Sequence, residues 1–273
     1  MNYVFIVISF AFLIPCICSI DLTQWELFEE NVAYFAIRNQ IMWKLDSTIV
    51  NSNGYRNYLW DNTLHQWKLD TGISVRIALD QNNVYCCHAG NQIFRKNNHD
   101  ISSFWTAFDT CTDVKVGSNN HVWIVTASLA TGGYQIKKYD ASTTTSTIIP
   151  GGAIKIAPTP DGNAWGINSI SNIMRWDGSS WSQVPGTARD IVVGNDGIPL
   201  IVSTVSSSTG YEIHKWNETL NQWVVLDGIQ GVLITLDSRG NPYVVTADYK
   251  VYRPMRGVLL DFCPSNTQFL NLI

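Results

Sequence analysis

The sequence predicts an all-β protein: a six-bladed β-propeller with four-stranded antiparallel blades, in which the N-terminal strand closes the ring. Three observations lead to this prediction. A strand that begins with a tryptophan is followed, in copy after copy, by an aliphatic strand and an Asx-Gly turn. The copies lie about 40 residues apart, which is the usual length of a propeller blade. The first and the last copy are incomplete, and each lacks what the other has.

The repeat is clearest at 181–197, which reads WSQVPGTARDIVVGNDG. Segments of the same pattern start at residues 25, 67, 105, 146 and 223, so that successive copies are 35 to 42 residues apart. Ser146 replaces the tryptophan in the fourth copy. A period of this length with four strands in each unit is typical of propellers.

One blade can be followed strand by strand. The aliphatic run Asp190–Val193 is strand A, and Asn-Asp-Gly turns it into strand B at Pro199–Ser203. Strand C follows at Tyr211–Trp216, and the tryptophan strand Gln222–Leu226 is strand D. Asn and Gly tolerate the positive φ that a tight hairpin turn requires, which favours a turn between strands A and B.

The two ends of the repeat array complete each other. Residues 23–28 form a D strand with no A, B or C strand before it. Val232–Leu236, Tyr243–Thr246 and Lys250–Arg253 form an A, B and C set with no clear D strand after it. We therefore expect residues 23–28 to complete the last blade. Ring closure of this kind removes two open sheet edges.

The N-terminus has the character of a targeting segment. Tyr3–Cys18 is almost wholly apolar, contains Pro15 and is shorter than the ~20 residues of a spanning helix. We interpret 1–19 as a secretory signal peptide, with an uncleaved anchor as the alternative because no Lys or Arg precedes the apolar run. The propeller then occupies 20–256 and a C-terminal tail 257–273, and the secreted chain has no membrane span.

Four cysteines remain after removal of the signal peptide: Cys86, Cys87, Cys111 and Cys263. In an oxidising compartment they allow two bridges in three connectivities, with buried free thiols as the alternative. Adjacent residues of a strand point to opposite faces, so Cys86 and Cys87 are expected to have different partners. Cys263 is a candidate to tie the tail to the propeller. The spacing of the four fits no zinc motif.

The repeat at 181–197, together with Ile-x-Arg-Trp-Asp-Gly at 173–178, resembles the tectonin-type propeller repeat. Proteins with this repeat include the tectonins, a tachylectin that binds lipopolysaccharide, and fish-egg lectins. The resemblance covers about 23–256 and implies a six-bladed lectin that binds sugars on microbial or cell surfaces. The chain departs from the pattern at Ser146 and at Val251–Pro254, which lacks the Trp-Asp-Gly turn.

Two sets of aromatic residues occupy fixed positions in the repeat. The tryptophans that start strand D are predicted to pack between blades: Trp25, Trp67, Trp105, Trp181 and Trp223. The aromatics that end strand C stand beside a polar turn, where a ring could stack on a sugar while Asp or Asn binds its hydroxyls. Turn formation by Asp and Asn is the structural alternative. Two arginines are candidates for an anionic glycan. The candidate carbohydrate-binding residues are Trp60, Asp61, Tyr139, Asp140, Trp176, Asp177, Trp216, Asn217, Arg175 and Arg189.

Other classes of function find little support. The net charge is −4 and no basic run occurs, which argues against a nucleic-acid partner. The five histidines are scattered, and the sequence has no His-Glu-x-x-His, Gly-x-Ser-x-Gly or phosphate-binding loop. We therefore predict a non-enzymatic protein without a metal centre or cofactor. Asp161-Gly162 and Asn195-Asp196-Gly197 offer oxygens to calcium, but their spacing is not that of a dedicated calcium loop. Asn217-Glu-Thr is an N-glycosylation sequon.

These observations favour a secreted lectin for microbial or cell-surface glycan, including lipopolysaccharide. Its sites are expected near blade boundaries, each weak alone and several acting together through avidity. The alternative is a secreted propeller scaffold that binds a protein, with every tryptophan structural.

Overall fold

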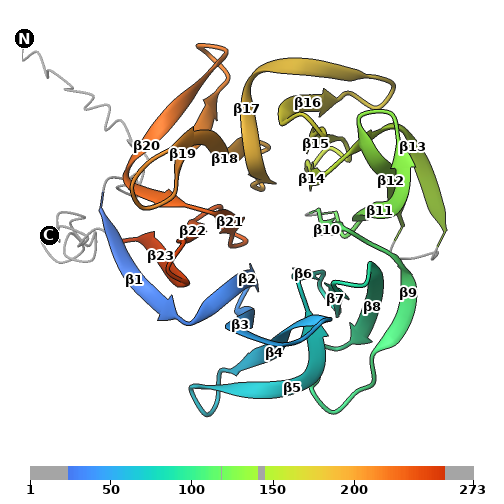
Figure 1. Ribbon diagram of the computed structural model, residues 1–273, viewed down its shortest axis with the longest axis vertical. Coiled ribbons are helices and arrows are strands. Elements are labelled where there is room, and N and C mark those ends of the chain that lie inside the picture. Colours follow the sequence, from blue (N-terminus) through green and yellow to red (C-terminus); the bar gives the residue numbers. More distant parts are fainter. Residues whose placement is uncertain (1–23, 118, 141–144, 256–273) are drawn as a thin grey trace, which may run out of the picture.

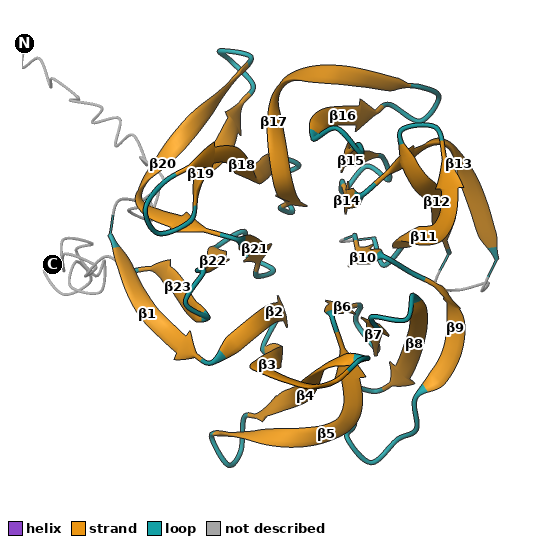
Figure 2. Cartoon of the chain, viewed as in Figure 1, coloured by secondary structure: helices purple, strands orange, loops and turns teal. Residues whose placement is uncertain are grey.

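The computed structural model describes residues 24–117, 119–140 and 145–255. The secondary structure of these residues consists of β-strands alone. The strands form antiparallel sheets arranged radially around a common centre (Figures 1 and 2). This arrangement is a β-propeller, as the sequence predicts. The predicted signal peptide 1–19, the tail 257–273 and its Cys263 lie outside the described residues.

Three four-stranded sheets follow one another in chain order. The first consists of β2 (Val32–Arg38), β3 (Ile41–Asn51), β4 (Gly54–Asp61) and β5 (Gln66–Ser74). The second consists of β6 (Arg76–Leu79), β7 (Asn83–Cys87), β8 (Gln92–Asn97) and β9 (Thr106–Thr110). The third consists of β10 (Asp113–Val116), β11 (Val122–Ala130), β12 (Gly133–Tyr139) and β13 (Ser146–Ala153).

A seven-stranded sheet comes next, because one long strand belongs to two neighbouring sets of four. Its strands are β14 (Lys155–Pro158), β15 (Ala164–Ile167), β16 (Asn172–Trp176), β17 (Trp181–Val193), β18 (Pro199–Ser206), β19 (Tyr211–Asn217) and β20 (Gln222–Gly231). The first half of β17 pairs with β16 as a D strand, and its second half pairs with β18 as an A strand. Gly186, at a φ of 103°, lies where the strand passes from one partner to the other.

The last sheet joins the two ends of the described chain. It has the strand order β1-β23-β22-β21, in which β21 (Leu233–Leu236), β22 (Pro242–Val245) and β23 (Lys250–Pro254) are followed by β1 (Trp25–Glu30). Trp25 is opposite Pro254 in the pairing of β1 with β23, which lie side by side in Figure 1. Arg253 Nε donates to Glu26 Oε1 at 2.6 Å, between residues 227 positions apart in the sequence.

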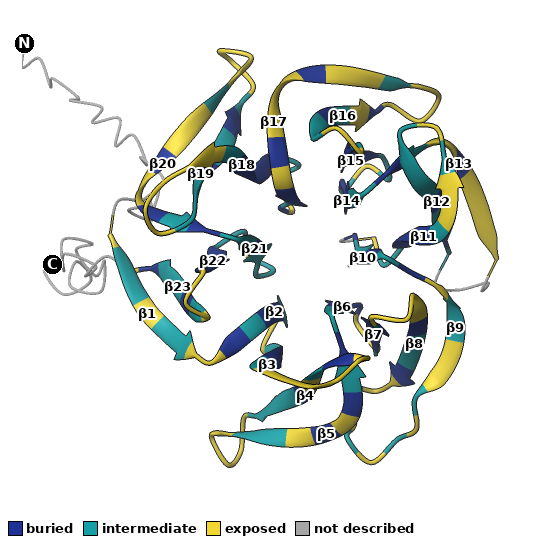
Figure 3. Ribbon diagram, in the orientation of Figure 1, coloured by how far each residue is buried: buried dark blue, intermediate teal, exposed yellow. Residues whose placement is uncertain are grey.

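The hydrophobic core is divided among the spaces between neighbouring sheets. One cluster joins Tyr34 and Trp43 of the first sheet with Ile77 and Val84 of the second. The inner strands A and B are therefore largely buried, whereas the outer strand D is largely exposed (Figure 3). Each blade alone would expose the face that its neighbour covers, so the blades are stable only as an array.

The five tryptophans predicted to pack between blades all do so. The indole N–H of each donates to the outer strand of the preceding sheet, where the acceptor is a backbone carbonyl or a carboxylate. The pairs are Trp25 to Asp227 O (3.1 Å), Trp67 to Glu29 Oε2 (2.9 Å), Trp105 to Asp70 Oδ1 (2.8 Å), Trp181 to Pro150 O (2.8 Å) and Trp223 to Pro185 O (2.8 Å). We call these residues the wedge tryptophans.

A buried ion pair reinforces one of these contacts. The side chains of Lys96 and Asp70 are both fully buried and form a salt bridge. Asp70 Oδ1 also accepts the indole N–H of Trp105 and the backbone N–H of Gly72, at 2.8 and 2.7 Å. The carboxylate therefore joins the first sheet to the second through Lys96 and Trp105, whereas its bond to Gly72 lies within β5.

The cysteines form one bridge within the described residues. Cys87 on β7 is joined to Cys111, which follows β9, across a sequence separation of 24. Cys86 points to the opposite side of β7, into the core between the first two sheets, and stays a free thiol. Burial raises its pKa to about 12. The two adjacent cysteines point to opposite faces of β7, as expected, but only Cys87 has a disulfide partner among the described residues. Cys86 instead agrees with the alternative of a buried free thiol.

We predict that Asp70→Ala lowers the free energy of unfolding by about 3–5 kcal/mol, because it leaves the Lys96 ammonium buried without its partner. Adding Lys96→Met should restore part of the loss. Asp248→Ala is the matched control, since the Asp248–Lys250 pair is exposed and its loss should hardly alter stability. Urea unfolding measures all three, and equal effects of Asp70→Ala and Asp248→Ala would contradict the assigned role.

We also predict that removal of the bridge by Cys87→Ala with Cys111→Ala lowers the free energy of unfolding by about 3 kcal/mol. The reason is that a link across 24 residues restricts the unfolded chain. A reducing agent should produce a similar loss in the native protein and none in the double variant. If the urea midpoint of the native protein were the same with and without the reducing agent, this account would be refuted.

Candidate functional site

Three clefts of one kind open on the face of the propeller that carries the A–B and C–D turns. Each lies between two successive blades and combines the end of strand C of one blade with the A–B turn of the next. Their volumes are about 420, 730 and 470 Å³, in chain order, and we call them the first, second and third cleft.

The first cleft lies between the first and second sheets, where Trp60 and Asn62 meet the turn residues Gln81 and Asn82, with His99 beside them. Trp60 is half-buried. It packs against Trp67, with 5.2 Å between ring centroids.

The second cleft lies between the third sheet and the strands β14–β17. Lys138 and His121 line one side, and the turn Asp161–Asn163 lines the other. Lys138 Nζ donates to Gly162 O at 2.9 Å and lies 5.4 Å from the ring centroid of Trp123. Burial lowers the pKa of His121, and Lys138 adds to this effect, so the imidazole is neutral at pH 7. Its Nδ1 is buried and has no hydrogen-bond partner among the described residues.

The third cleft lies between the two halves of the seven-stranded sheet. Arg175 and Asp177, from the end of β16, face the turn Asn195–Gly197 and Glu218. Arg175 is exposed, and its guanidinium carbon lies 5.3 Å from the ring centroid of Trp165. The cleft therefore offers one cation, several carboxylates and two amides, all within reach of solvent.

The aspartates of these turns accept hydrogen bonds from backbone N–H groups of the same turn. Asp161 Oδ1 accepts the N–H of Asn163 at 3.1 Å, and Asp196 Oδ1 accepts that of Ile198 at 3.0 Å. Gly162 and Gly197 adopt φ values of 88° and 78°, which complete the A–B turns. These contacts agree with the structural alternative of turn formation.

Asp177 belongs to the C–D turn and is engaged in the same way. Its Oδ1 accepts the backbone N–H groups of Ser180 and Ser179, both at 2.8 Å. These bonds, with those from the two serine hydroxyls, lower the pKa of the exposed Asp177 carboxyl to about 2. Asp61 has the corresponding place beside β4, where the Lys68 ammonium and two backbone N–H groups lower its pKa to about 2.

The aromatic residues at the end of strand C are more buried than a stacking role requires. Exposure of Trp176, Trp216 and Tyr139 is 6, 4 and 8%. Trp176 packs against the wedge residue Trp181, and Trp216 against Trp223, with centroids 5.4 and 5.0 Å apart. The expectation of an open ring face is therefore corrected for these three, because blade packing covers the rings.

Tyr139 compensates for the missing wedge tryptophan in the fourth copy. Ser146 stands at the wedge position of this blade, and the outer strand β9 of the preceding sheet carries Asp109. The hydroxyl of Tyr139 donates to Asp109, and Lys137 Nζ donates to the same carboxylate at 2.8 Å. Tyr139 is thus a substitute link between blades.

Half of the predicted carbohydrate-binding residues line the three clefts: Trp60, Asp140, Arg175, Trp176 and Asp177. The other half lie outside the linings: Asp61, Tyr139, Trp216, Asn217 and Arg189. Arg189 stacks on Tyr211 instead, 4.2 Å from its ring centroid. Asn217 is half-exposed and its Oδ1 accepts the N–H of Leu220 at 3.0 Å.

Comparison with known proteins agrees with this architecture. Residues 152–259 match the Tectonin domain family. The chain is a β-propeller with tectonin-type repeats. A segment of 48 residues is 42% identical to Tectonin-2 of Physarum polycephalum, and it spans 17% of this chain and 14% of that relative.

A solved structure has a similar propeller fold over most of the chain. It is the crystal structure of the β-propeller domain of Cps50 (Swd1) from Myceliophteria thermophila, with a TM-score of 0.56. The match covers 83% of this chain and 84% of the other at 10% identity, so it shows the fold alone.

Several residues of the clefts were missed from the sequence. Asn82, Asn163 and Asn195 belong to A–B turns, whose Asx-Gly pattern indicated a turn and gave no sign of a neighbour. Lys138 and His121 had no distinguishing motif. The three asparagines come close to the C–D turn of another blade because successive blades of the propeller pack face to face.

The described residues were also compared with the requirements of a metal site and of a membrane-spanning helix. Within residues 24–117, 119–140 and 145–255, no three His, Cys, Asp or Glu side chains gather as a metal site. The same ranges contain no helix long and apolar enough to span a membrane.

We predict that the carboxyl group of Asp177 titrates with a midpoint near pH 2, against an ordinary pKa of 3.8, because backbone N–H groups favour its ionised form. Its contribution to stability is then complete above pH 3.8 and is lost as the pH falls towards 2. NMR titration of the carboxyl resonance measures the midpoint. Ser179→Ala should raise it slightly, and a midpoint near 3.8 in the unmodified protein would contradict the turn geometry.

Proposed function

We propose that this chain is a secreted, non-enzymatic lectin that binds carbohydrate through the three clefts at its blade boundaries. The observation that carries the proposal is the repetition of one polar cleft at equivalent boundaries on a single face. Repeated shallow sites on one face can engage a surface that displays many copies of a glycan. The overall affinity then exceeds that of each cleft.

We further infer a six-bladed ring closed by the N-terminal strand. If β17 is counted in both of its four-stranded sets, six sets result, and β1 supplies the D strand of the last one. The axial cavity supports the same number, because strands β2, β6, β10, β14, β17 and β21 all line it.

Secretion is supported by two features. The apolar segment of 1–19 has the length of a signal peptide, and the Cys87–Cys111 bridge is of the kind that persists in an oxidising compartment. Asn217 of the sequon is the last residue of β19 and is half-exposed, which supports a glycan at this position.

The chemistry of the clefts favours polar recognition over ring stacking. Because the rings of Trp176, Trp216 and Tyr139 are covered and only Trp60 is half-buried, sugar hydroxyls would mainly meet carboxylates, amides and cations at the rims. In the third cleft these are Asp177, Asn195 and Arg175, all exposed. In the second cleft Lys138 supplies a cation. Cations of this kind suit phosphorylated or acidic microbial glycans, lipopolysaccharide among them.

A protein-binding scaffold is the second candidate, and a different surface favours it. The outer D strands carry exposed aliphatic residues, namely Leu69 (55%), Ile148 (58%), Val224 (42%) and Val225 (43%). These lie on the outer strands of the propeller, and of the four only Ile148 also lines a cleft, the second one. Capture of a stoichiometric protein partner that no sugar displaces would favour this reading.

The proposed function predicts that Arg175→Ala and Asp177→Asn each weaken glycan binding by about tenfold, since a hydrogen bond to a charged group contributes about 1.5–3 kcal/mol. Asp177→Asn retains a side-chain oxygen for the turn and removes the charge. Arg56→Ala is the matched control, because Arg56 is exposed on β4 outside all three clefts.

Binding is measured on a glycan array and on immobilised lipopolysaccharide and agarose, with and without calcium. Silence across bacterial, fungal and host glycans would overturn the lectin proposal. A loss that was equal in Arg56→Ala and Arg175→Ala would move binding away from the third cleft.

A further inference from the structure

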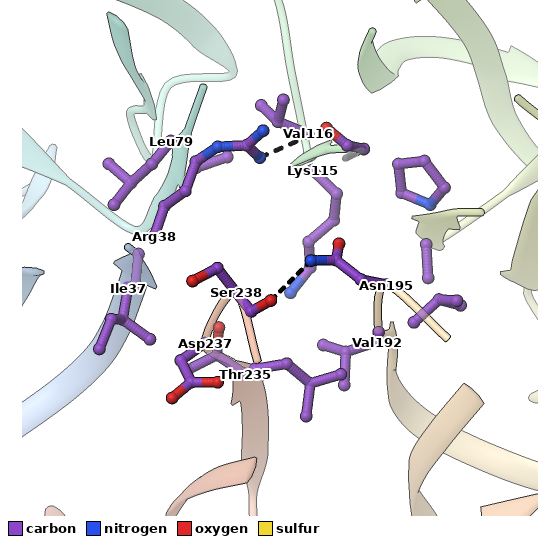
Figure 4. A pocket seen from close by; sticks show the side chains of 18 of the residues that line it. Ile37, Arg38, Leu79, Lys115, Val116, Val192, Asn195, Thr235, Asp237 and Ser238 are labelled. Carbon is purple, nitrogen blue, oxygen red and sulfur yellow. Dashed lines mark hydrogen bonds between the residues drawn. The ribbon is translucent and has the colours of Figure 1, made fainter. Parts of the chain in front are cut away.

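A cavity of about 350 Å³ lies on the axis of the propeller. Its rim shares Gln81 with the first cleft and Pro160 and Asn195 with the third, whereas Tyr34 and Lys115 line the cavity alone. Its wall is built from the inner strands, and its mouth from A–B turn residues such as Arg38, Asn195 and Ser238 (Figure 4). The volume is within the range of small-molecule sites, roughly 300–1,000 Å³.

Four charged residues at the start of the inner strands balance one another beside this cavity. Asp113, fully buried, accepts from Lys155 Nζ at 3.2 Å and lies 3.7 Å from Arg76 Nε. Asp190, 2% exposed, accepts the backbone N–H of Ile234 at 3.1 Å. Two carboxylates and two cations give this group no formal net charge.

Lys115 adds a positive charge that the group does not balance. Its Nζ donates to Tyr34 Oη at 3.2 Å, and no carboxylate of the described residues lies within ion-pair distance of it. Burial works to lower the pKa of Lys115, but Tyr34, Asp190 and Asp113 outweigh it and the pKa is raised, so the ammonium is charged. Its side chain is directed into the cavity in Figure 4.

The mouth does not supply the missing negative charge. Arg38 at the rim donates to Asn120 Oδ1 at 2.8 Å and to Gly117 O at 3.3 Å. Asp237 is a rim carboxylate, but its Oδ1 accepts the N–H groups of Arg239 and Asn241 within its own turn. Asp80, a buried carboxylate that interacts with Arg38, accepts hydrogen bonds from Asn83 and Tyr85 of its own blade. No carboxylate of the described residues therefore lies at ion-pair distance from the Lys115 ammonium.

We propose that the axial cavity binds a compact oxyanion, a carboxylate or a phosphate, with Lys115 as its principal contact. An ammonium group has three donors, and Tyr34 occupies one, so two are free for oxygens of the anion. Charge-assisted hydrogen bonds in an enclosed site are stronger than their counterparts in water. The site is independent of the lectin proposal, because no residue of this contact belongs to the three clefts.

Thermal unfolding of the full secreted chain tests the site with sodium phosphate and sodium acetate, against sodium chloride at equal ionic strength. Phosphate or acetate should raise Tm above the chloride reference, because a ligand that binds the folded state stabilises it. A response to phosphate alone or to acetate alone identifies the preferred oxyanion. Equal Tm values in all three salts would overturn the proposal.

Two variants locate the site. Lys115→Met removes the charge at nearly constant length and should abolish the response, whereas Lys250→Met, at an exposed lysine of β23, should retain it. Thr235→Glu places a carboxylate in the same cavity without touching Lys115, and should abolish the response in a folded protein. Retention of the response in a folded Lys115→Met or Thr235→Glu protein would overturn the assignment. Arg175→Ala should retain the response even if it loses glycan binding.

Discussion

The contact between each wedge tryptophan and the blade before it is the interaction on which the rest of the structure depends. A single blade has two broad faces and too little chain to cover either. The wedge tryptophan fills the gap at the outer edge, and its N–H is bonded to the preceding D strand in all five copies. This satisfies the one polar group that a large, partly buried ring brings with it. The contact can therefore repeat from blade to blade without leaving the N–H of a wedge tryptophan unpaired.

Charged residues add specificity to this packing at two depths. On the outer D strands, the Asp70 carboxylate binds Lys96 and the wedge residue Trp105. The Asp109 carboxylate binds Tyr139 and Lys137 where the wedge tryptophan is missing. Near the axis, Asp113 reaches the backbone of Ile156 and Asp190 that of Ile234, each in the next inner strand. Buried carboxylates are costly unless several donors meet them, and here neighbouring blades supply those donors. The same charges leave Lys115 unbalanced on the axis.

The clefts arise from the same geometry. Blades that pack face to face at their middle diverge at the turns, and a polar hollow forms between one C–D turn and the next A–B turn. The aromatic residue at the end of strand C contributes mainly to the blade interface, as the burial of Trp176 and Trp216 indicates. Recognition is thereby shifted to exposed polar residues such as Arg175 and Asn195. These vary from boundary to boundary, which gives each cleft its own charge.

The sequence by itself determined the β-propeller fold, the strand order within a repeat, the packing role of the wedge tryptophans and the different environments of Cys86 and Cys87. These depend on patterns within about one repeat: alternation, turn residues and tryptophan spacing. Only the tertiary structure decided that Tyr139 replaces the absent tryptophan, that Trp216 is covered, and that Asn163 or Asn195 faces a turn of another blade. It also decided that Lys115 lies on the axis without a carboxylate at ion-pair distance among the described residues. The physical reason is that burial and charge balance at these positions are set by residues one blade or more away, which local sequence patterns do not encode.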